Sequence, residues 1–180
     1  MSSNKQNKKK KNTPDTQNTS NTFKVTAEML KNGDVLCGLI IRFLHNRTKE
    51  NMFSLLSCLR DSNVFVPSNL SAEPNTAEIG GKGDNPIMFP VKQSIKITPQ
   101  IYKATDGNLY MPLYSRQVNA RPEHLKGASL VNMPYTECLK MLKNAQGCSR
   151  FVLDPHLYNV VLDEDLVRIS GELPSRLSKS

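Results

Sequence analysis

One histidine stands among four acidic residues in the stretch FVLDPHLYNVVLDEDLVRIS, residues 151–170. They are His156 and Asp154, Asp163, Glu164 and Asp165. A histidine near carboxylates is the combination used in general acid–base catalysis and in many metal sites. These carboxylates lie across a turn from His156 and do not match H-E-x-x-H or another compact metal motif. An unrecognised hydrolase that uses His156 and the acids near it is therefore one hypothesis to weigh.

Local structure accounts for the same acids without any chemistry. Asp154-Pro155 is a turn dipeptide in which the aspartate can bond nearby backbone amides, and it places His156 at the tip of a loop. Asp163 and the two acids after it precede an apolar helical pattern, where acidic side chains oppose the positive end of the helix dipole. The stretch thus predicts a turn and then a capped helix.

The remaining reactive side chains also lack a recognisable site. The segment GGKGDN at 80–85 does not have the spacing of a phosphate-binding loop, and no G-x-S-x-G motif presents a serine nucleophile. The four cysteines form no C-x-x-C pair, and Cys138 lies on the apolar stripe of a helix, as a buried structural thiol does. His45, His124 and His156 are scattered in the sequence, so we expect an exposed, solvated ring for each, and their convergence in the fold stays open. We predict no catalytic residue, no metal site and no cofactor.

Half of the net positive charge is concentrated near the amino terminus. The 180 residues carry a net charge of +8, of which residues 1–22 hold +4. This arm has too few apolar side chains to offset the entropy cost of ordering, and we expect it to be disordered. The mildly basic remainder, residues 23–180, is predicted to form one domain. The charges of the arm come from Lys5, Lys8, Lys9, Lys10, Lys11 and Asp15.

Neither secretion nor a membrane span is indicated. The longest apolar run, VLCGLIIRFL, is too short to cross a bilayer and contains Arg42. No apolar segment with a cleavage site adjoins the basic amino terminus. The cysteines are expected to be reduced thiols, and a cytoplasmic location is the prediction that follows.

The chain after the arm alternates between helical and strand patterns. Helical spacing over 35–44 follows Asp34, which is placed to cap the first turn, and Thr48 is placed to cap a second helix. A strand at 63–67 leads into a long polar loop expected over 68–86. These elements favour an α/β (α+β) fold.

The second half of the chain adds a hairpin and further segments that alternate between strand and helix patterns. Asp106-Gly107 separates two alternating runs within 94–115 and predicts a tight turn. After it we expect a strand at 129–133, a helix begun by Pro134 and ended by Gly147, strands at 150–153 and 160–162, and a helix after Asp163. The whole pattern predicts a single domain with a mixed β-sheet flanked by helices.

Aromatic and cationic side chains interleave on the expected hairpin: Tyr102, Tyr110 and Tyr114 with Lys96, Lys103 and Arg116. Such interleaving can stack nucleic-acid bases or anchor a protein partner. The alternative is that helices cover this face and the tyrosines belong to the core. The candidate partner-binding residues, from the arm and the hairpin, are Lys8, Lys9, Lys10, Lys11, Tyr102, Tyr110 and Arg116.

Three short motifs follow one another along the chain: a V-x-V-P strand end at Val64–Pro67, the D-G hairpin leading to Pro112 and Tyr114, and a strand that ends at Asp154-Pro155. In this order they resemble the amino-terminal domain of the SseB (enhanced serine sensitivity) family of bacterial proteins, over residues 35–170. Tyr114 stands where that family commonly has phenylalanine, and Asp154 where an asparagine-proline pair is usual. The resemblance implies the fold, and it carries over no catalytic residue.

The leading interpretation is a non-enzymatic cytoplasmic interaction module that binds another protein, because no set of reactive residues converges in the sequence. Nucleic-acid or ribosome association through the basic arm and hairpin is an alternative, and its binding would fall steeply with salt. The hydrolase built on His156 is the third hypothesis. The identity of the partner and the oligomeric state stay open.

Overall fold

The computed structural model describes residues 26–73 and 94–177 as a single α+β domain. The lysine arm at 1–22 and the segment GGKGDN lie outside these residues. The loop expected over 68–86 is wrong in its first part, because residues 68–73 continue strand β1 (Asn63–Glu73). Pro67 is tolerated inside this strand because it lies where β1 changes its pairing partner from one neighbouring strand to another.

Three helices open the described domain: α1 (Ala27–Lys31), α2 (Asp34–His45) and α3 (Lys49–Asp61). Thr48 caps α3 as predicted, since its side chain accepts a hydrogen bond from the Asn51 amide at 3.2 Å. The two longer helices bury the apolar faces expected from their spacing, through Leu36, Ile40, Leu55, Leu56 and Leu59.

The predicted cap of α2 by Asp34 is wrong. Gly33 is the N-cap residue, with φ of 78°, and the side chain of Asn32 accepts from the Asp34 amide at 3.0 Å. A β-carbon on Gly33 would lie 1.7 Å from the carbonyl oxygen of Ser115. Only glycine therefore allows the start of α2 to approach the strand layer this closely.

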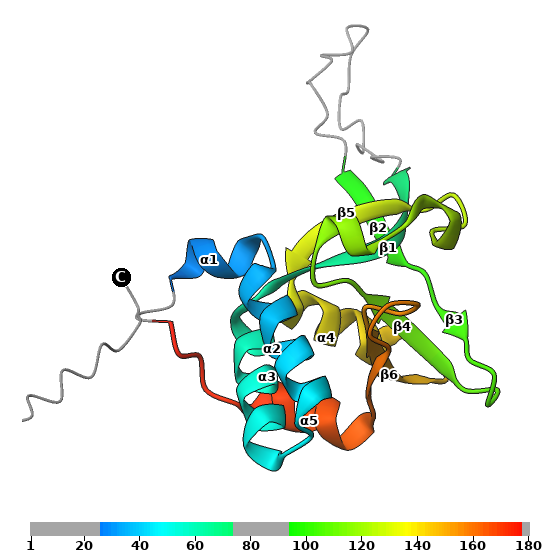
Figure 1. The fold of residues 1–180 in the computed structure, drawn as a ribbon. Helices are drawn as coiled ribbons and strands as arrows, with labels where there is room; N and C mark the ends of the chain where they lie inside the picture. Colours follow the sequence, from blue (N-terminus) through cyan, green and yellow to red (C-terminus); the bar gives the residue numbers. More distant parts are fainter. Residues whose placement is uncertain (1–25, 74–93, 178–180) are drawn as a thin grey trace, which may run out of the picture.

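Two sheets form the strand layer (Figure 1). The first has the order β2-β1-β5 and is antiparallel, with β2 (Ser94–Pro99) and β5 (Ser129–Pro134) on either side of β1. The second has the order β3-β4-β6-β7 and is mixed. Its strands are β3 (Tyr102–Lys103), β4 (Leu109–Leu113), β6 (Cys148–Leu153) and β7 (Val160–Leu162).

The hairpin predicted at Asp106-Gly107 is confirmed but short. β3 and β4 pair antiparallel around it, and Gly107 has φ of 85°. The first alternating run does not form the other arm, because residues 94–99 pair with β1 instead. The alternating pattern identified residues 94–99 as a strand but did not identify β1 as the strand with which they pair.

Helices α4 (Tyr135–Asn144) and α5 (Glu164–Glu172) complete the helical layer, and α3 contacts both of them. The two sheets are joined where Phe65 and Tyr114 exchange backbone hydrogen bonds of 2.9 Å each. Two short 3-10 turns, η1 (Gln117–Asn119) and η2 (Pro122–His124), follow β4. The core lies between the helices and the two sheets.

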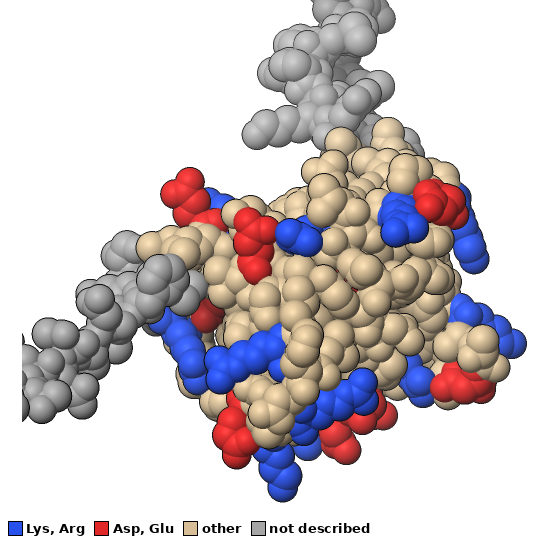
Figure 2. Space-filling view, in the orientation of Figure 1, with Lys and Arg blue, Asp and Glu red and all other residues tan. Residues whose placement is uncertain are grey.

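The surface of the described domain carries charges of both signs. Its residues include fifteen Lys and Arg against thirteen Asp and Glu, a net charge of +2. On the face shown in Figure 2, basic and acidic side chains are interspersed. Such a surface offers no strong electrostatic preference for a polyanion.

Candidate functional site

Strands β4 and β6 run parallel, so their carboxyl ends meet at one edge of the second sheet. Ser115 comes shortly after β4, and Asp154 directly follows β6. In open α/β sheets, the crevice outside the carboxyl ends of parallel strands is the usual place for a ligand. This edge is the first part of the fold in which to expect a site.

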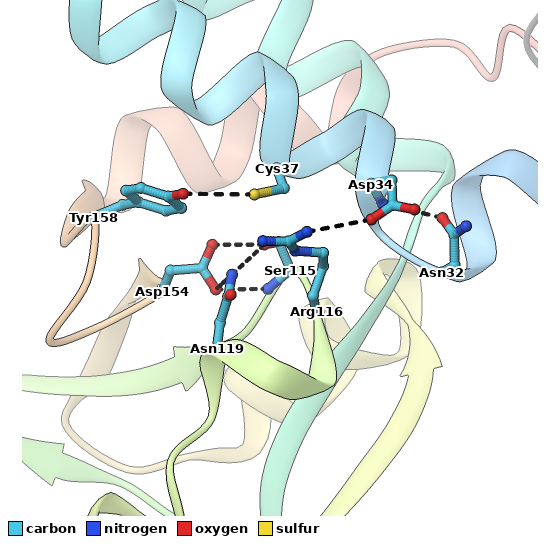
Figure 3. Close-up of polar contacts among 8 residues, drawn as sticks. All are labelled: Asn32, Asp34, Cys37, Ser115, Arg116, Asn119, Asp154 and Tyr158. Atoms are coloured by element: carbon cyan, nitrogen blue, oxygen red, sulfur yellow. Dashed lines mark hydrogen bonds and ion pairs between the residues drawn. The ribbon is translucent and has the colours of Figure 1, made fainter.

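Asp154 is fully buried at this edge, and its carboxylate binds the segment that follows β4 (Figure 3). The backbone amide of Ser115 donates to Oδ1 at 2.9 Å, and the Ser115 hydroxyl donates to Oδ2 at 2.6 Å. The side-chain amide of Asn119 donates to the same Oδ1 at 3.0 Å and to the Ser115 hydroxyl oxygen at 3.1 Å. These bonds fix the two strand ends to each other.

The loop after β6, residues 154–159, has an unusual backbone. The carbonyl of Asp154 accepts hydrogen bonds from the amides of residues 157–159 at 2.9 to 3.1 Å. Asp154, His156 and Asn159 all have left-handed backbones, with φ of 45°, 68° and 52°. The predicted turn is confirmed. The prediction that the aspartate side chain bonds local amides is wrong, because its carbonyl does so while its carboxylate crosses to the segment after β4.

The cluster extends from the strand ends to the first helices. Burial raises the pKa of Asp154 and outweighs the lowering effects of its hydrogen-bond donors and of nearby Arg116. Arg116 pairs with Asp34 of α2 at 3.5 Å. The Cys37 thiol, on the same helix, donates to the Tyr158 hydroxyl at 3.8 Å. Loop 154–159 is thereby held from two sides.

This cluster has the contacts of a structural latch and lacks those of a hydrolase. Ser115 bonds the Asp154 carboxylate directly and is fully buried, whereas a catalytic serine needs a base such as histidine and access to substrate. The acids after β7 bind elsewhere: Asp163 caps α5 as predicted, and Asp165 pairs with Arg168. Across residues 26–73 and 94–177, no three His, Cys, Asp or Glu side chains lie close enough to hold a metal ion.

The buried thiol predicted on α4 is confirmed. Cys138 is fully buried, and burial raises its pKa to about 12. The thiol therefore stays protonated near neutral pH and is a poor nucleophile.

A small cavity lies beside the latch, between η1–η2 and loop 154–159. Its volume is about 80 Å³, and its lining includes Arg121, His124 and His156. The two imidazole rings stack with centroids 4.0 Å apart and planes inclined by 30°. His156 is exposed as expected, whereas His124 is half-buried, and the two converge in the fold. The two histidines are 32 positions apart in the sequence, which gave no sign that they would meet.

Two exposed apolar side chains also line this cavity. Val118 of η1 is 76% exposed and Leu157 of the loop is 50% exposed. Both belong to the segments that the Asp154 latch joins. We call Val118, Leu157 and the adjoining cavity the carboxyl-end surface. Sequence reasoning missed Val118 because an isolated valine in a polar turn carries no distinctive signal.

Among the described residues, the predicted partner-binding side chains Tyr102, Tyr110 and Arg116 differ in exposure and do not form one exposed face. Tyr102 is only 7% exposed, and its hydroxyl donates to the His124 carbonyl at 2.8 Å. Tyr110 is half-buried and meets the Tyr102 ring edge-on, and Arg116 is partly exposed. The arm residues Lys8, Lys9, Lys10 and Lys11 lie outside the described ranges. Their role in binding stays a prediction.

A larger, shallower groove of about 800 Å³ lies between α4 and α5. Many of its charges are already paired: Lys140 with Glu137 at 2.7 Å, and Arg168 with acidic neighbours on both sides. The groove is a comparison surface for the experiments below. No helix in the described ranges is long and apolar enough to cross a membrane.

Comparison with known proteins identifies the domain. A family model described as the SseB protein N-terminal domain matches residues 39–168. The match takes in β1, the hairpin, the latch and both histidines of the cavity. No curated protein and no solved structure matches the chain. Because the family model covers most of the chain, the chain belongs to the SseB family, through its amino-terminal domain.

Proposed function

We propose that this chain is a protein-binding module without a catalytic step of its own, and that its partner docks on the carboxyl-end surface. The observation that carries the proposal is the exposure of Val118 and Leu157 on two segments that are fixed by a buried hydrogen-bond network. Exposed apolar side chains on a rigid support suit binding, because little conformational entropy is lost when they are covered.

The charges around the surface favour one kind of partner. Arg121 and the histidine pair adjoin the apolar side chains, and no carboxylate lines the cavity among the described residues. A protein segment that carries an acidic group next to small apolar side chains complements this arrangement. Val118 and Leu157 would contact its apolar part, and the cationic cavity its acidic part.

Nucleic-acid binding is less well supported by the described residues. A stacking platform needs exposed aromatic faces, whereas Tyr102 is buried in the domain. The net charge of +2 is also small for a domain that neutralises several phosphates. The lysine arm keeps this hypothesis testable, because removing residues 1–22 would weaken such binding and salt would abolish it.

Site-specific photo-crosslinking tests the docking surface. A photoreactive amino acid is placed at position 118 or 157 of the full chain, and at position 143 in the α4–α5 groove for comparison. We expect discrete protein adducts from 118 and 157 that are absent from 143. The adduct from 118 should disappear in a Leu157→Asp background.

The matched control is Ile95→Asp, which places a charge on another exposed apolar position, 64% exposed on β2. The adduct from position 118 should persist in this background. Adducts that form only from position 143, or that contain nucleic acid, would overturn the proposal. An adduct lost equally in both aspartate variants would also count against it, since the effect would then be general rather than local.

A further inference from the structure

The stacked histidines belong to segments that are held independently. His124 ends η2, where its amide donates to the Arg121 carbonyl at 2.9 Å and its carbonyl accepts from the Tyr102 hydroxyl. His156 lies in loop 154–159, fixed by the three amides that bind the Asp154 carbonyl. The rings therefore meet through the tertiary fold, and their positions are set before any ligand arrives.

The cavity beside the rings is the right size for a small ionic group. Its volume is about 80 Å³, while a site for one water needs roughly 10 to 15 Å³. Arg121 is the one residue of permanent charge that lines it within the described ranges. Asn119 also lines it, but both hydrogens of its amide group are directed to the latch. The lining thus offers donors from a guanidinium and two imidazoles.

The histidine pair has unused hydrogen-bonding capacity. Nδ1 of His124 is buried and has no hydrogen-bond partner among the residues that the structure describes. Burial and the neighbouring ring of His124 lower the pKa of His156, so His156 resists taking up a proton. The other nearby charged residues in the chain are Glu123 and Lys126, beside His124, and Asp154, whose carboxylate is occupied by the latch.

We propose that this cavity is an oxyanion-binding subsite, in which the Arg121 guanidinium and the imidazoles of His124 and His156 donate to the oxygens of a carboxylate, sulfate or phosphate group. A carboxylate or sulfate accepts hydrogen bonds only, so it matches the guanidinium and imidazole N–H groups of the lining. Its negative charge also offsets the cost of adding a proton to His156. Binding is therefore coupled to protonation of His156.

The inference rests on the proposed function only for the source of the anion. If the ligand is a protein segment, the group is a carboxylate beside apolar side chains that cover Val118 and Leu157. If it is a free ion, the cavity binds it without those contacts. The chemistry of recognition is the same in both cases, and the experiments separate the two.

Nuclear magnetic resonance of the histidine rings in the full-length protein tests the subsite. Sodium sulfate and sodium acetate are titrated in separate series, with sodium chloride keeping the ionic strength constant. His45 is an internal reference, because it is exposed on α2 and its Nδ1 is bonded to the Ile41 carbonyl at 2.9 Å. We expect saturable shifts at His124 and His156 and none at His45.

The pH dependence has a definite sign. Because the pKa of free His156 is lowered and the anion favours its protonated form, affinity should rise as the pH falls toward the pKa of free His156, by up to about tenfold per pH unit for one coupled proton, and level off below it. Sulfate keeps the same charge across this range, so the rise belongs to the protein. An affinity independent of pH between 5 and 8 would refute the coupling to the histidines.

Two variants that each remove one positive charge distinguish a specific binding site from nonspecific electrostatic attraction. Arg121→Gln should weaken binding by at least about tenfold, because it removes a charge-assisted donor of the cavity. Lys126→Gln removes an equal charge close by in sequence, where its ammonium lies over the Tyr102 ring at 4.9 Å, and should change binding less than twofold. Equal losses in both variants, or unsaturable shifts, would overturn the subsite.

These outcomes are distinguishable from those of the crosslinking experiment. Saturable anion binding without adducts at positions 118 and 157 would keep the subsite and remove the protein partner. Adducts without any response of the two histidines would keep the docking surface and overturn the subsite. If acetate, but not chloride, reduced crosslinking at positions 118 and 157, the anion subsite and the docking surface would be shown to bind the same partner.

Discussion

Replacing Asp154 by alanine tests whether the latch holds the carboxyl-end surface together. The change removes the acceptor of the Ser115 amide and hydroxyl and one of the two acceptors of Asn119. Each buried donor left without a partner costs about 1 to 3 kcal/mol. Alanine is also strained at φ of 45°, by roughly 1 kcal/mol. Removing a buried carboxylate offsets part of this cost.

The net loss expected for Asp154→Ala is about 3 kcal/mol, out of roughly 5 to 15 kcal/mol for a whole domain. It corresponds to a fall in melting temperature of roughly 6 to 12 °C. Urea unfolding followed by circular dichroism measures it, since the chain contains no tryptophan for fluorescence. Asp165→Ala, at an exposed position of α5, is the control and should cost less than about 0.5 kcal/mol. A loss below about 1 kcal/mol for Asp154→Ala would refute the latch.

Asp154→Asn separates the charge of the latch from its shape. Asparagine tolerates the left-handed backbone and keeps an acceptor for the Ser115 and Asn119 amides, so we expect stability within about 1 kcal/mol of the wild type. Burial raises the pKa of Asp154 above its ordinary value of 3.8, so the folded protein holds this proton more tightly than the unfolded chain. Ionisation therefore lowers the free energy of unfolding as the pH rises through that raised pKa.

The asparagine variant has no such titration. The wild type should thus lose stability relative to Asp154→Asn as the pH rises from 3.8 upward, and the difference should level off above the raised pKa. Urea unfolding of both proteins from pH 4 to 8 measures the difference. Parallel pH profiles would show that burial does not dominate the titration of this carboxyl.

Two pairs of substitutions and one thiol reaction test the packing. Tyr114→Phe should be neutral or stabilise the domain by up to about 1 kcal/mol, because the buried hydroxyl of Tyr114 has no hydrogen-bond partner among the described residues. Tyr135→Phe should instead destabilise it by about 1 kcal/mol, because it loses a 2.6 Å hydrogen bond to a serine hydroxyl. Urea unfolding compares them, and effects of the same sign would contradict the assignment. Gly33→Ala should lower the free energy of unfolding by more than about 2 kcal/mol in the same assay, because the added β-carbon would meet a carbonyl oxygen. Gly38→Ala, at an open position in the middle of α2, should instead raise it by about 0.5 to 1 kcal/mol. Cys138 should resist alkylation by iodoacetamide at pH 8 in the folded protein and react after unfolding, as measured by peptide mass spectrometry. If Cys138 in the folded protein reacted as fast as an exposed thiol, its burial would be contradicted.

Most predictions that depend on near neighbours in the sequence are confirmed, although the Asp34 cap and the local bonding of the Asp154 side chain are not. Thr48 and Asp163 cap their helices because a side-chain oxygen reaches an amide three residues away, a distance that sequence spacing determines. The turn at Asp106-Gly107 follows from the ease with which glycine adopts positive φ. The motifs that resemble the SseB family are also short and local, and the family assignment is confirmed.

The amino-acid sequence by itself thus determined four of the five α-helices of the described residues, with α1 not predicted, together with the turn, most of the strands and the family. Tertiary structure decided which strands pair, that Asp154 binds Ser115 across 39 positions, and that His124 stacks on His156. Periodicity and capping depend on neighbours within a few residues, so they can be read along the chain. Contacts between distant residues depend on how whole layers pack, and a residue's type does not specify which distant group it will meet.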